Sequence, residues 1–435
     1  MEHVRLSELS RSFLTNESII LWWSVANLIL VYLTKDEEAM LEGEYGEGKQ
    51  IAMSLLVDVG EFFEAEKLID IASAHISGVS YLTGGDGLID QLDLFVSKGA
   101  KVAVPSTLNP CGMDRDHYQD LYIDLDFATK QFRILDNFER MDVATTCSCT
   151  PYDFSHLLTK GQHVAWAESS AVTFANSFFG ARTNKEDSLT VLSAAITGKT
   201  PYYGFHLEEE RIPNVAVDVK AIIDEYSDYS ILGEIVGKAF SKHAFPFGAI
   251  PVFKGLSNPR PQDLKALGAA LASFGTQLFH VEGITPEQEL IAKASIQDQI
   301  SVTEEDIIST YEKFRPTAEP DIAVIGCPNA NLEEIAAVTK LVKGRTLKKN
   351  KAFWLFSSSA QKAIADKSGY LKVLNEAGVR FVTDTCPEVF KYDKDKFKII
   401  LTNSIKAAHY IPAPSLNNIP TYLLPLRECV EEMYQ

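Results

Sequence analysis

The chain has 435 residues, of which 46% are hydrophobic and 23% charged, and its formal net charge is -18. These fractions exclude a disordered, collagenous or fibrous chain, and the length predicts two or three packed units. The negative charge repels phosphates and anionic lipids, so we expect no nucleic-acid or membrane partner. The six cysteines are too few and scattered for a disulfide scaffold, which predicts a cytoplasmic protein with free thiols.

The most apolar stretch of the chain covers residues 18–33. It has about 16 residues, fewer than the roughly 20 needed to span a bilayer, and it contains Asn27. The acidic residues near the start are not typical of a signal peptide. We interpret the stretch either as a buried or interfacial helix, or as part of an extension, residues 1–30, before a protein that begins near Val31. Neither interpretation assigns it a function.

The chain after this stretch has the pattern of an α/β enzyme. Thr34 and Glu37 predict a capping box that opens a helix. Residues 217–244 are predicted to be mostly helical, and the polar, Pro-rich segment 257–261 is the best candidate for a linker. We therefore divide the chain into an N-terminal α/β region, 31–256, and a C-terminal α/β region, 257–435.

The C-terminal region contains four apolar, β-rich runs, each followed by small polar residues or cysteine. These runs are residues 322–325, 353–356, 379–382 and 399–401. Helical segments between them predict a parallel sheet covered by helices. Ligands bind at the carboxyl ends of the strands in such sheets. We therefore expect the chemistry where these runs end.

Cysteines at these strand ends are candidate metal ligands. Cys327 and Cys386 follow the first and third runs, and Cys147 and Cys149 share a separate Thr- and Ser-rich segment. An inert buried thiol is the commonest fate of a free cysteine. Cysteines at neighbouring strand ends can nevertheless meet, and thiolates suit iron–sulfur clusters or zinc. The spacing alone does not decide between these alternatives.

Three further segments carry polar groups that could act in a site. Glu168, Ser169 and Ser170 follow an apolar run, and they are either a general base with orienting hydroxyls or the cap and first turn of a helix. The glycine-rich segment 78–87 is a weak anion-binding signal. Lys406 follows the fourth run, where it could neutralise a phosphate or carboxylate or be a surface lysine.

Several motifs together resemble the aconitase X family. They are VPSTLN at 104–109, AWAESSAV at 165–172, ANSFFGARTN at 175–184, GCP at 326–328, DTC at 384–386 and NSIKAAHY at 403–410. The resemblance covers the chain from about Val31 to its end. It implies an α/β fold, with an aconitase-like multi-domain core of parallel sheets flanked by helices. It also implies an iron–sulfur dehydratase, that is, a hydro-lyase.

The resemblance also implies the metal ligands, which by position are Cys149, Cys327 and Cys386. The implied cofactor is an iron–sulfur cluster, foremost a 4Fe–4S cluster, in which three thiolates leave one iron open. That iron would act as a Lewis acid on the departing hydroxyl. Cys147, two residues from the first ligand, stays open as its alternative.

The family's substrate residues carry over in the same way. Glu168 and Ser169 would be the catalytic pair that holds the substrate near the cluster. The other implied substrate-binding residues are Gly78, Val79, Ser80, Asn109, Pro110 and Lys406.

Partner and substrate follow from the branch of the family that lacks a fused swivel domain. Such a chain is the large, catalytic subunit, and the resemblance implies a separate small subunit that supplies a catalytic serine. The implied reaction is removal of water from (R)-5-phosphomevalonate, a small anionic substrate, to give trans-anhydromevalonate 5-phosphate in the archaeal mevalonate pathway. The alternatives are dehydration of cis-3-hydroxy-L-proline or another hydroxy acid, or a non-catalytic scaffold stabilised by a metal such as zinc.

Overall fold

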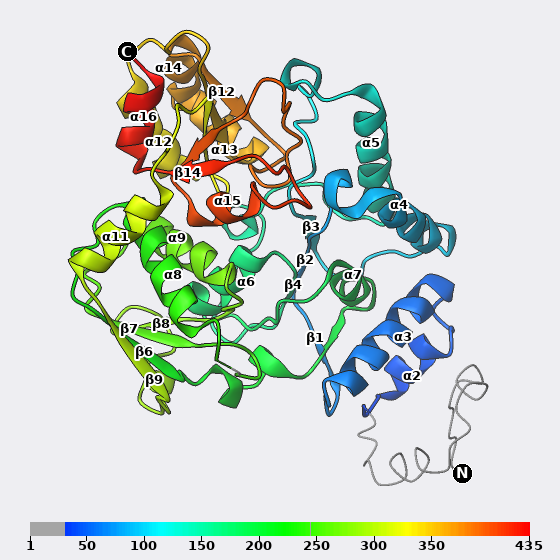
Figure 1. Ribbon diagram of the computed structural model, residues 1–435. Coiled ribbons are helices and arrows are strands. Elements are labelled where there is room, and N and C mark those ends of the chain that lie inside the picture. Colours follow the sequence, from blue (N-terminus) through cyan, green and yellow to red (C-terminus); the bar gives the residue numbers. More distant parts are fainter. Residues whose placement is uncertain (1–30, 244) are drawn as a thin grey trace, which may run out of the picture.

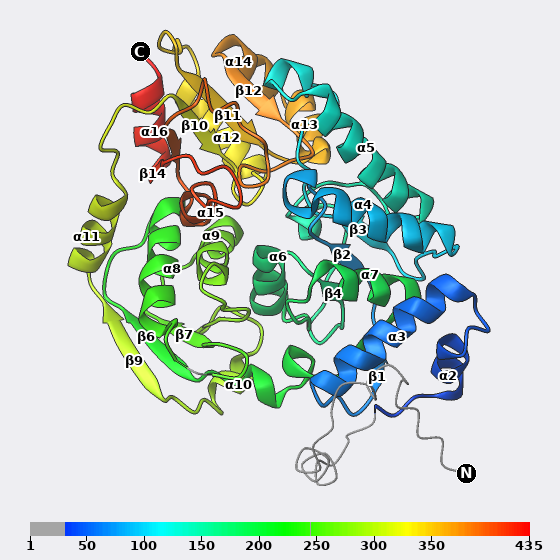
Figure 2. The same cartoon turned by 45° about the vertical axis from the view of Figure 1, so that its right-hand side comes forward.

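The computed structural model describes residues 31–243 and 245–435 of the chain (Figure 1). The predicted extension, 1–30, and the helix predicted over most of 18–33 lie outside these residues. In the described part of the chain, no helix is long and apolar enough to cross a bilayer. Three α/β units, each with its own parallel sheet, make up the fold (Figure 2).

The first unit contains a parallel sheet in the order β3-β2-β4 and an antiparallel β1–β5 pair. Its first helix begins at the predicted capping box, which is confirmed by reciprocal hydrogen bonds between Thr34 and Glu37. Apolar residues of α3, α4, α5 and α7 form a core with the sheet. The elements are α2 (Lys35–Leu41), α3 (Glu47–Phe62), β1 (Leu68–Asp70), β2 (Ala74–Ile76), α4 (Tyr81–Ser97), β3 (Ser106–Leu108), α5 (Leu125–Arg140), β4 (Ala165–Trp166), α6 (Ser169–Phe174), α7 (Ser188–Thr197) and β5 (Lys199–Pro201).

The second unit is a four-stranded parallel sheet, β8-β7-β6-β9, packed against α8 and α9. The prediction of a mostly helical segment at 217–244 is wrong at its start, because alternating buried residues form β6 there. The segment 257–261, predicted as a linker, joins β7 to α9 within this unit, so the sheet has strands from both predicted regions. The elements are β6 (Val215–Val219), α8 (Tyr226–Phe240), β7 (Pro251–Lys254), α9 (Pro261–Ala272), β8 (His280–Val281), α10 (Gln288–Ile291), β9 (Asp298–Val302) and α11 (Glu304–Phe314).

The third unit is a five-stranded parallel sheet in the order β12-β11-β10-β13-β14. The four predicted runs form β10 to β13, which confirms the parallel sheet flanked by helices. One face packs against α12, α14 and α16, whereas the other packs against Met113 and Phe127 of the first unit. The elements are β10 (Ile322–Ile325), α12 (Leu332–Val342), β11 (Ala352–Phe356), α13 (Ser359–Lys367), α14 (Tyr370–Glu376), β12 (Val379–Val382), β13 (Ile400–Thr402), α15 (Ile405–Tyr410), β14 (Thr421–Leu423) and α16 (Leu426–Met433).

Candidate active site

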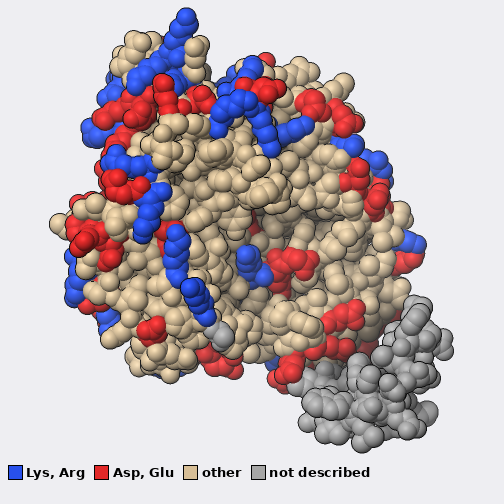
Figure 3. Space-filling view, in the orientation of Figure 1, with Lys and Arg blue, Asp and Glu red and all other residues tan. Residues whose placement is uncertain are grey.

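Polar side chains from the carboxyl ends of the first and third sheets meet in one buried cluster. Glu168 follows β4 in the first unit, and Lys406 lies on α15, which follows β13 in the third. The ammonium of Lys406 donates to Oε1 of Glu168 at 2.5 Å, and Nδ2 of Asn109 donates to Oε2 at 3.0 Å. On the face shown in Figure 3, charged side chains gather mainly toward the edges, whereas these three side chains are buried inside the fold.

The ammonium of Lys406 serves two carboxyl groups, since Oε1 of Glu388 lies 3.8 Å from it. Burial acts to raise the pKa of Glu168, but Lys406 and hydrogen bonds from Ser170 outweigh it and lower that pKa to about 2. Burial raises the pKa of Glu388, with Lys406 opposing and Glu168 adding to the rise. Burial acts to lower the pKa of Lys406, yet the two carboxylates raise it well above its usual value. Glu168 and Lys406 therefore form the ionised pair.

The three predicted metal ligands lie around this pair and are all buried. The thiol of Cys327 donates to Oε1 of Glu388 at 2.8 Å. The thiol of Cys149 donates to Oδ1 of Asn329 at 3.3 Å and accepts that residue's backbone N–H at 3.2 Å. Burial raises the pKa of Cys386, and Glu388 and then Cys149 add to the rise. The three thiols thus share one neighbourhood.

The donor set has the chemistry that an iron–sulfur cluster needs. Over residues 31–243 and 245–435, no three His, Cys, Asp or Glu side chains converge as ligands of a single ion. An iron–sulfur cluster does not require its ligands to converge on a single ion, because each cysteine binds a different iron at the outside of the inorganic core. Burial raises the pKa of Cys149, Cys327 and Cys386. Binding of a cluster by these residues would require the loss of the thiol protons.

Cys147 lies in different surroundings from Cys149. A hydrogen bond with Cys111 and burial raise the pKa of Cys147, and the charges that act on it are those of Arg115 and Asp384. The charges that act on Cys149 are Glu168, Lys406 and Glu388. The structure therefore places Cys149, and not Cys147, beside the ion pair.

The predicted substrate residues of the first unit lie at the carboxyl ends of β2 and β3. Ser80 caps α4 by accepting the N–H of Leu82 at 3.2 Å, and its hydroxyl donates to the carbonyl of Val389 at 3.2 Å. Val389 adjoins Glu388, so this hydrogen bond ties the first unit to the cluster. The residues at these two ends are Gly78, Val79, Ser80, Asn109 and Pro110.

The helix-cap interpretation of the segment at Glu168 is confirmed. Glu168 is the N-cap of α6, accepting the N–H of Ser170, and it is also the partner of Lys406. The hydroxyl that touches this carboxylate is that of Ser170, at 2.8 Å, and the half-buried Ser169 stands beside it at the start of the helix.

Four residues of the site were not found from the sequence: Glu388, Asn329, Tyr226 and Lys265. Glu388 lies two residues after Cys386. Its position among the polar residues that follow a predicted strand is the signal from which it could have been found. Tyr226 and Lys265 belong to the second unit. The hydroxyl of Tyr226 donates to the carbonyl of Cys327, and the ammonium of Lys265 donates to the carbonyl of Asn329, both at 3.0 Å. No local pattern predicts these contacts, because the partners are far apart in the chain.

The loop that carries Cys327 also depends on Gly326. Its φ is 101°, and a Cβ atom there would lie 2.1 Å from the carbonyl oxygen of Phe356. A side chain is excluded on both grounds, so glycine allows this loop to pass close to β11.

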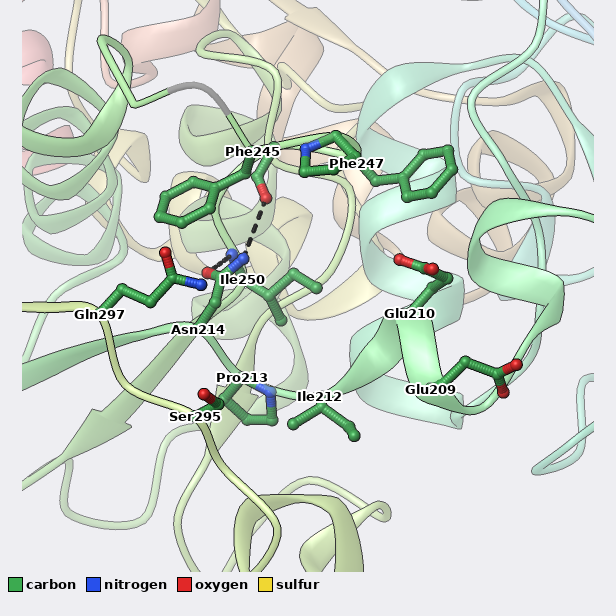
Figure 4. A pocket seen from close by; sticks show the side chains of 12 residues that line it. Glu209, Glu210, Ile212, Pro213, Asn214, Phe245, Phe247, Ile250, Ser295 and Gln297 are labelled. Atoms are coloured by element: carbon green, nitrogen blue, oxygen red, sulfur yellow. Dashed lines mark hydrogen bonds between the residues drawn. The ribbon is translucent and has the colours of Figure 1, made fainter. Parts of the chain in front are cut away.

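A separate pocket of about 270 Å³ lies beside the segment 209–214 (Figure 4). Phe245 and Phe247 line one side of it and Glu209 and Glu210 another. None of the predicted site residues lines this pocket, so it is distinct from the cluster.

Comparison with known proteins agrees with the division of the chain into three units. Models of the aconitase X first, second and third domains match residues 30–209, 213–312 and 320–435, and each segment contains one of the three parallel sheets. The phosphomevalonate dehydratase large subunit of Methanocaldococcus jannaschii is 44% identical over 88% of this chain and 96% of its own length. The large subunit from Methanothermobacter thermautotrophicus is 41% identical over 88% and 94%.

A more distant relative and a solved structure complete the comparison. The cis-3-hydroxy-L-proline dehydratase of Pseudomonas aeruginosa is 32% identical, over 91% of this chain and 68% of its own. The crystal structure of Thermococcus kodakaraensis aconitase X in its holo-form superposes with a TM-score of 0.84 at 39% identity, covering 93% of this chain and all of that one. With its three domains matched in order, the chain belongs to the aconitase X family.

Proposed function

We propose that this chain is the large, catalytic subunit of a dehydratase that converts (R)-5-phosphomevalonate to trans-anhydromevalonate 5-phosphate. The observation that carries the proposal is the buried cluster in which three thiols lie within the electrostatic reach of Lys406, which is paired with Glu168. The names of the relatives support the substrate. Five phosphomevalonate dehydratase large subunits are 32% to 44% identical and match over 92% to 96% of their own length. Two hydroxyproline dehydratases are 31% and 32% identical and match over 68% of theirs.

Cys149, Cys327 and Cys386 would hold a 4Fe–4S cluster with one iron open. Such a cluster supplies Lewis-acid activation of the leaving hydroxyl. Beside it, Lys406 provides the positive charge for an anionic end of the substrate. Glu168 keeps Lys406 ionised and oriented, and Asn109 fixes the second oxygen of that carboxylate.

A phosphate needs a second cation, and Lys185 is placed to provide it. Its backbone forms a bridge with Trp166, two residues before Glu168. Partial burial lowers the pKa of Lys185, with Glu168 opposing and Lys406 adding to this effect. Lys185 therefore stands in the same electrostatic neighbourhood as the buried pair. Two ammonium groups suit a substrate with a phosphate and a carboxylate better than hydroxyproline, which carries one carboxylate and its own ring ammonium.

The proton acceptor is proposed to come from a second chain. Glu168, with its pKa lowered to about 2, is a poor base at neutral pH. The words "large subunit" in the names of the relatives support a small-subunit partner. We assign the base to a serine of that partner.

The test is co-expression with the small subunit, anaerobic purification and parallel assays on 5-phosphomevalonate and cis-3-hydroxy-L-proline. We expect consumption of the first substrate alone, by a brown protein with about four irons per chain. Consumption of hydroxyproline alone would assign the other activity, and a colourless zinc protein would support the scaffold.

A matched pair of variants tests the ligand assignment. Cys327→Ser should abolish iron binding while retaining the fold. Cys429→Ser is the control, because among the described residues its buried thiol donates to the carbonyls of Thr402 and Leu424, outside the cluster. Equal iron content in the two variants would remove Cys327 from the ligand set.

A further inference from the structure

A row of three buried polar side chains crosses the sheet of the first unit behind Asn109. His75 on β2 and Thr107 on β3 are register partners, so their side chains share one face of the sheet. Nδ1 of His75 lies 2.8 Å from Oγ1 of Thr107, and Oγ1 lies 2.9 Å from Nε2 of His156. All three side chains are buried, His75 completely. One hydroxyl therefore bridges two imidazoles in the interior.

Both imidazoles of the row are neutral at physiological pH. Burial lowers the pKa of His75 to about 3, with His156 adding to this effect and with Glu168 and the side chain of Asn109 opposing it. Burial lowers the pKa of His156 to about 4. A neutral imidazole has one N–H donor and one acceptor nitrogen, and a hydroxyl has a single proton. The Thr107 hydroxyl can therefore donate to only one of the two imidazoles, and a chain of hydrogen bonds through it has a single direction.

The orientation of Asn109 identifies that direction. Nδ2 of Asn109 donates to Glu168, which leaves its Oδ1 as the atom available to His75. Nε2 of His75 and Oδ1 of Asn109 are both buried, and neither has a hydrogen-bond partner among the described residues. Asn109 is one of the side chains that act on the pKa of His75, so the two groups are neighbours. Since Oδ1 can only accept, a hydrogen bond between them requires the proton on Nε2 of His75. Nδ1 then accepts from Thr107, whose oxygen accepts from His156.

We propose that His156, Thr107 and His75 are positioning residues that fix the amide of Asn109 so that it donates to Glu168. The row holds the carboxylate in the orientation that pairs with Lys406. Without the Thr107 hydroxyl, His75 can take either tautomer. The imidazole then no longer holds Oδ1 of Asn109 on the side of His75. This inference rests on the proposed function for its effect on catalysis, but the tautomer of His75 is measurable without any substrate.

The test compares Thr107→Val, which keeps the shape and removes the hydroxyl, with Thr107→Ser, which restores it. The control is Thr339→Val, whose buried hydroxyl donates to a carbonyl of its own helix, α12. We expect Thr107→Val alone to lower kcat/KM at least about tenfold, mainly through kcat, with Thr107→Ser near wild type. Imidazole ¹⁵N shifts should report the Nε2–H tautomer of His75 in the wild type and a mixture in Thr107→Val.

An unchanged tautomer in a folded Thr107→Val protein would overturn the row, whatever the activity. A changed tautomer with kcat/KM equal to that of Thr339→Val would overturn its positioning role. If no variant dehydrates 5-phosphomevalonate but the tautomer changes, the proposed function fails while the row stands. Should Thr107→Val not fold, His156→Gln, which can still donate, is compared with His156→Leu, which cannot. Equal tautomer signals in that pair would contradict the row.

Discussion

Two buried ion-pair clusters in this protein differ in how completely their charges are matched. In the second unit, Nε and Nη2 of Arg211 donate to both oxygens of Glu287 at 2.7 to 3.2 Å, and its remaining donors reach Asn176 and Phe205. In the site, Lys406 shares one ammonium between Glu168 at 2.5 Å and Glu388 at 3.8 Å. The Arg211–Glu287 cluster, here called the matched cluster, stabilises the fold. In the Lys406–Glu168–Glu388 cluster, here called the under-matched cluster, one ammonium serves two carboxyl groups, so the cluster can still interact with a ligand.

Glu186 extends this comparison to a buried carboxyl group without a cation. Among the described residues its partners are the hydroxyls of Tyr203 at 3.3 Å and Thr200 at 3.4 Å. Burial raises the pKa of Glu186 to about 7. In the first case a carboxylate has its own cation, in the second two carboxyl groups share one cation, and in the third a carboxyl group has no cation among the described residues.

Breaking the matched cluster should have the largest effect on stability. Arg211→Met leaves Glu287 buried without its partner, which should lower the free energy of unfolding by about 3–5 kcal/mol. The control is Arg315→Met, whose exposed partners are Glu312 and Glu428, with an expected loss of at most about 1 kcal/mol. Urea denaturation followed by circular dichroism measures both. Equal losses would mean that Arg211 does not stabilise the fold as its contacts indicate.

Breaking the under-matched cluster should affect activity more than folding. Lys406→Met removes the cation shared by Glu168 and Glu388, and a proton taken up by the carboxyl groups limits the loss of stability to about 1–3 kcal/mol. The anionic substrate loses its buried partner, so kcat/KM should fall at least about 100-fold. Lys293→Met, which breaks an exposed pair with Glu208, is the control. Full activity in Lys406→Met would remove this lysine from the site.

The carboxyl group without a cation should make stability depend on pH. The folded pKa of Glu186, about 7, lies above its usual value of 4.5, so the folded state binds more protons between these values. Its contribution is fully present below pH 4.5 and is lost as pH rises through 7, by at most about 3 kcal/mol. Urea midpoints at pH 5 and pH 8 measure the loss. Glu186→Gln should flatten the difference, and an unchanged slope in that variant would assign the effect to another group.

The sequence predicts the parts of this site that follow directly from strands. The runs that became β10 to β13 were recognisable from composition and spacing, and the carboxyl ends of parallel strands meet at one edge. Cys327, Cys386 and Lys406 could therefore be placed near one another. The capping box at Thr34 was equally local, and it opens α2 as expected.

The remaining parts depend on contacts between units, which no local pattern records. Glu388 acquires its role because the loop after β12 folds back over Cys327. The row behind Asn109 exists because β2 and β3 pair in a register that aligns His75 with Thr107. Strand β6 was missed because its five residues precede a longer helical pattern, and periodicity over a long window favours the helix.

The smallest expected effect concerns how the second unit supports the cysteine loop. Tyr226→Phe removes one hydrogen bond to the carbonyl of Cys327, which should cost about 0.5–1.5 kcal/mol. The matched control is Tyr311→Phe, whose hydroxyl donates to Asp228 at 2.8 Å inside the same unit, and which should cost at least as much. If the hydrogen bond from Tyr226 holds the loop for metal binding, only Tyr226→Phe should release iron faster to a chelator, about severalfold. Equal release by both variants would show that the hydrogen bond from Tyr226 does not hold the loop for metal binding.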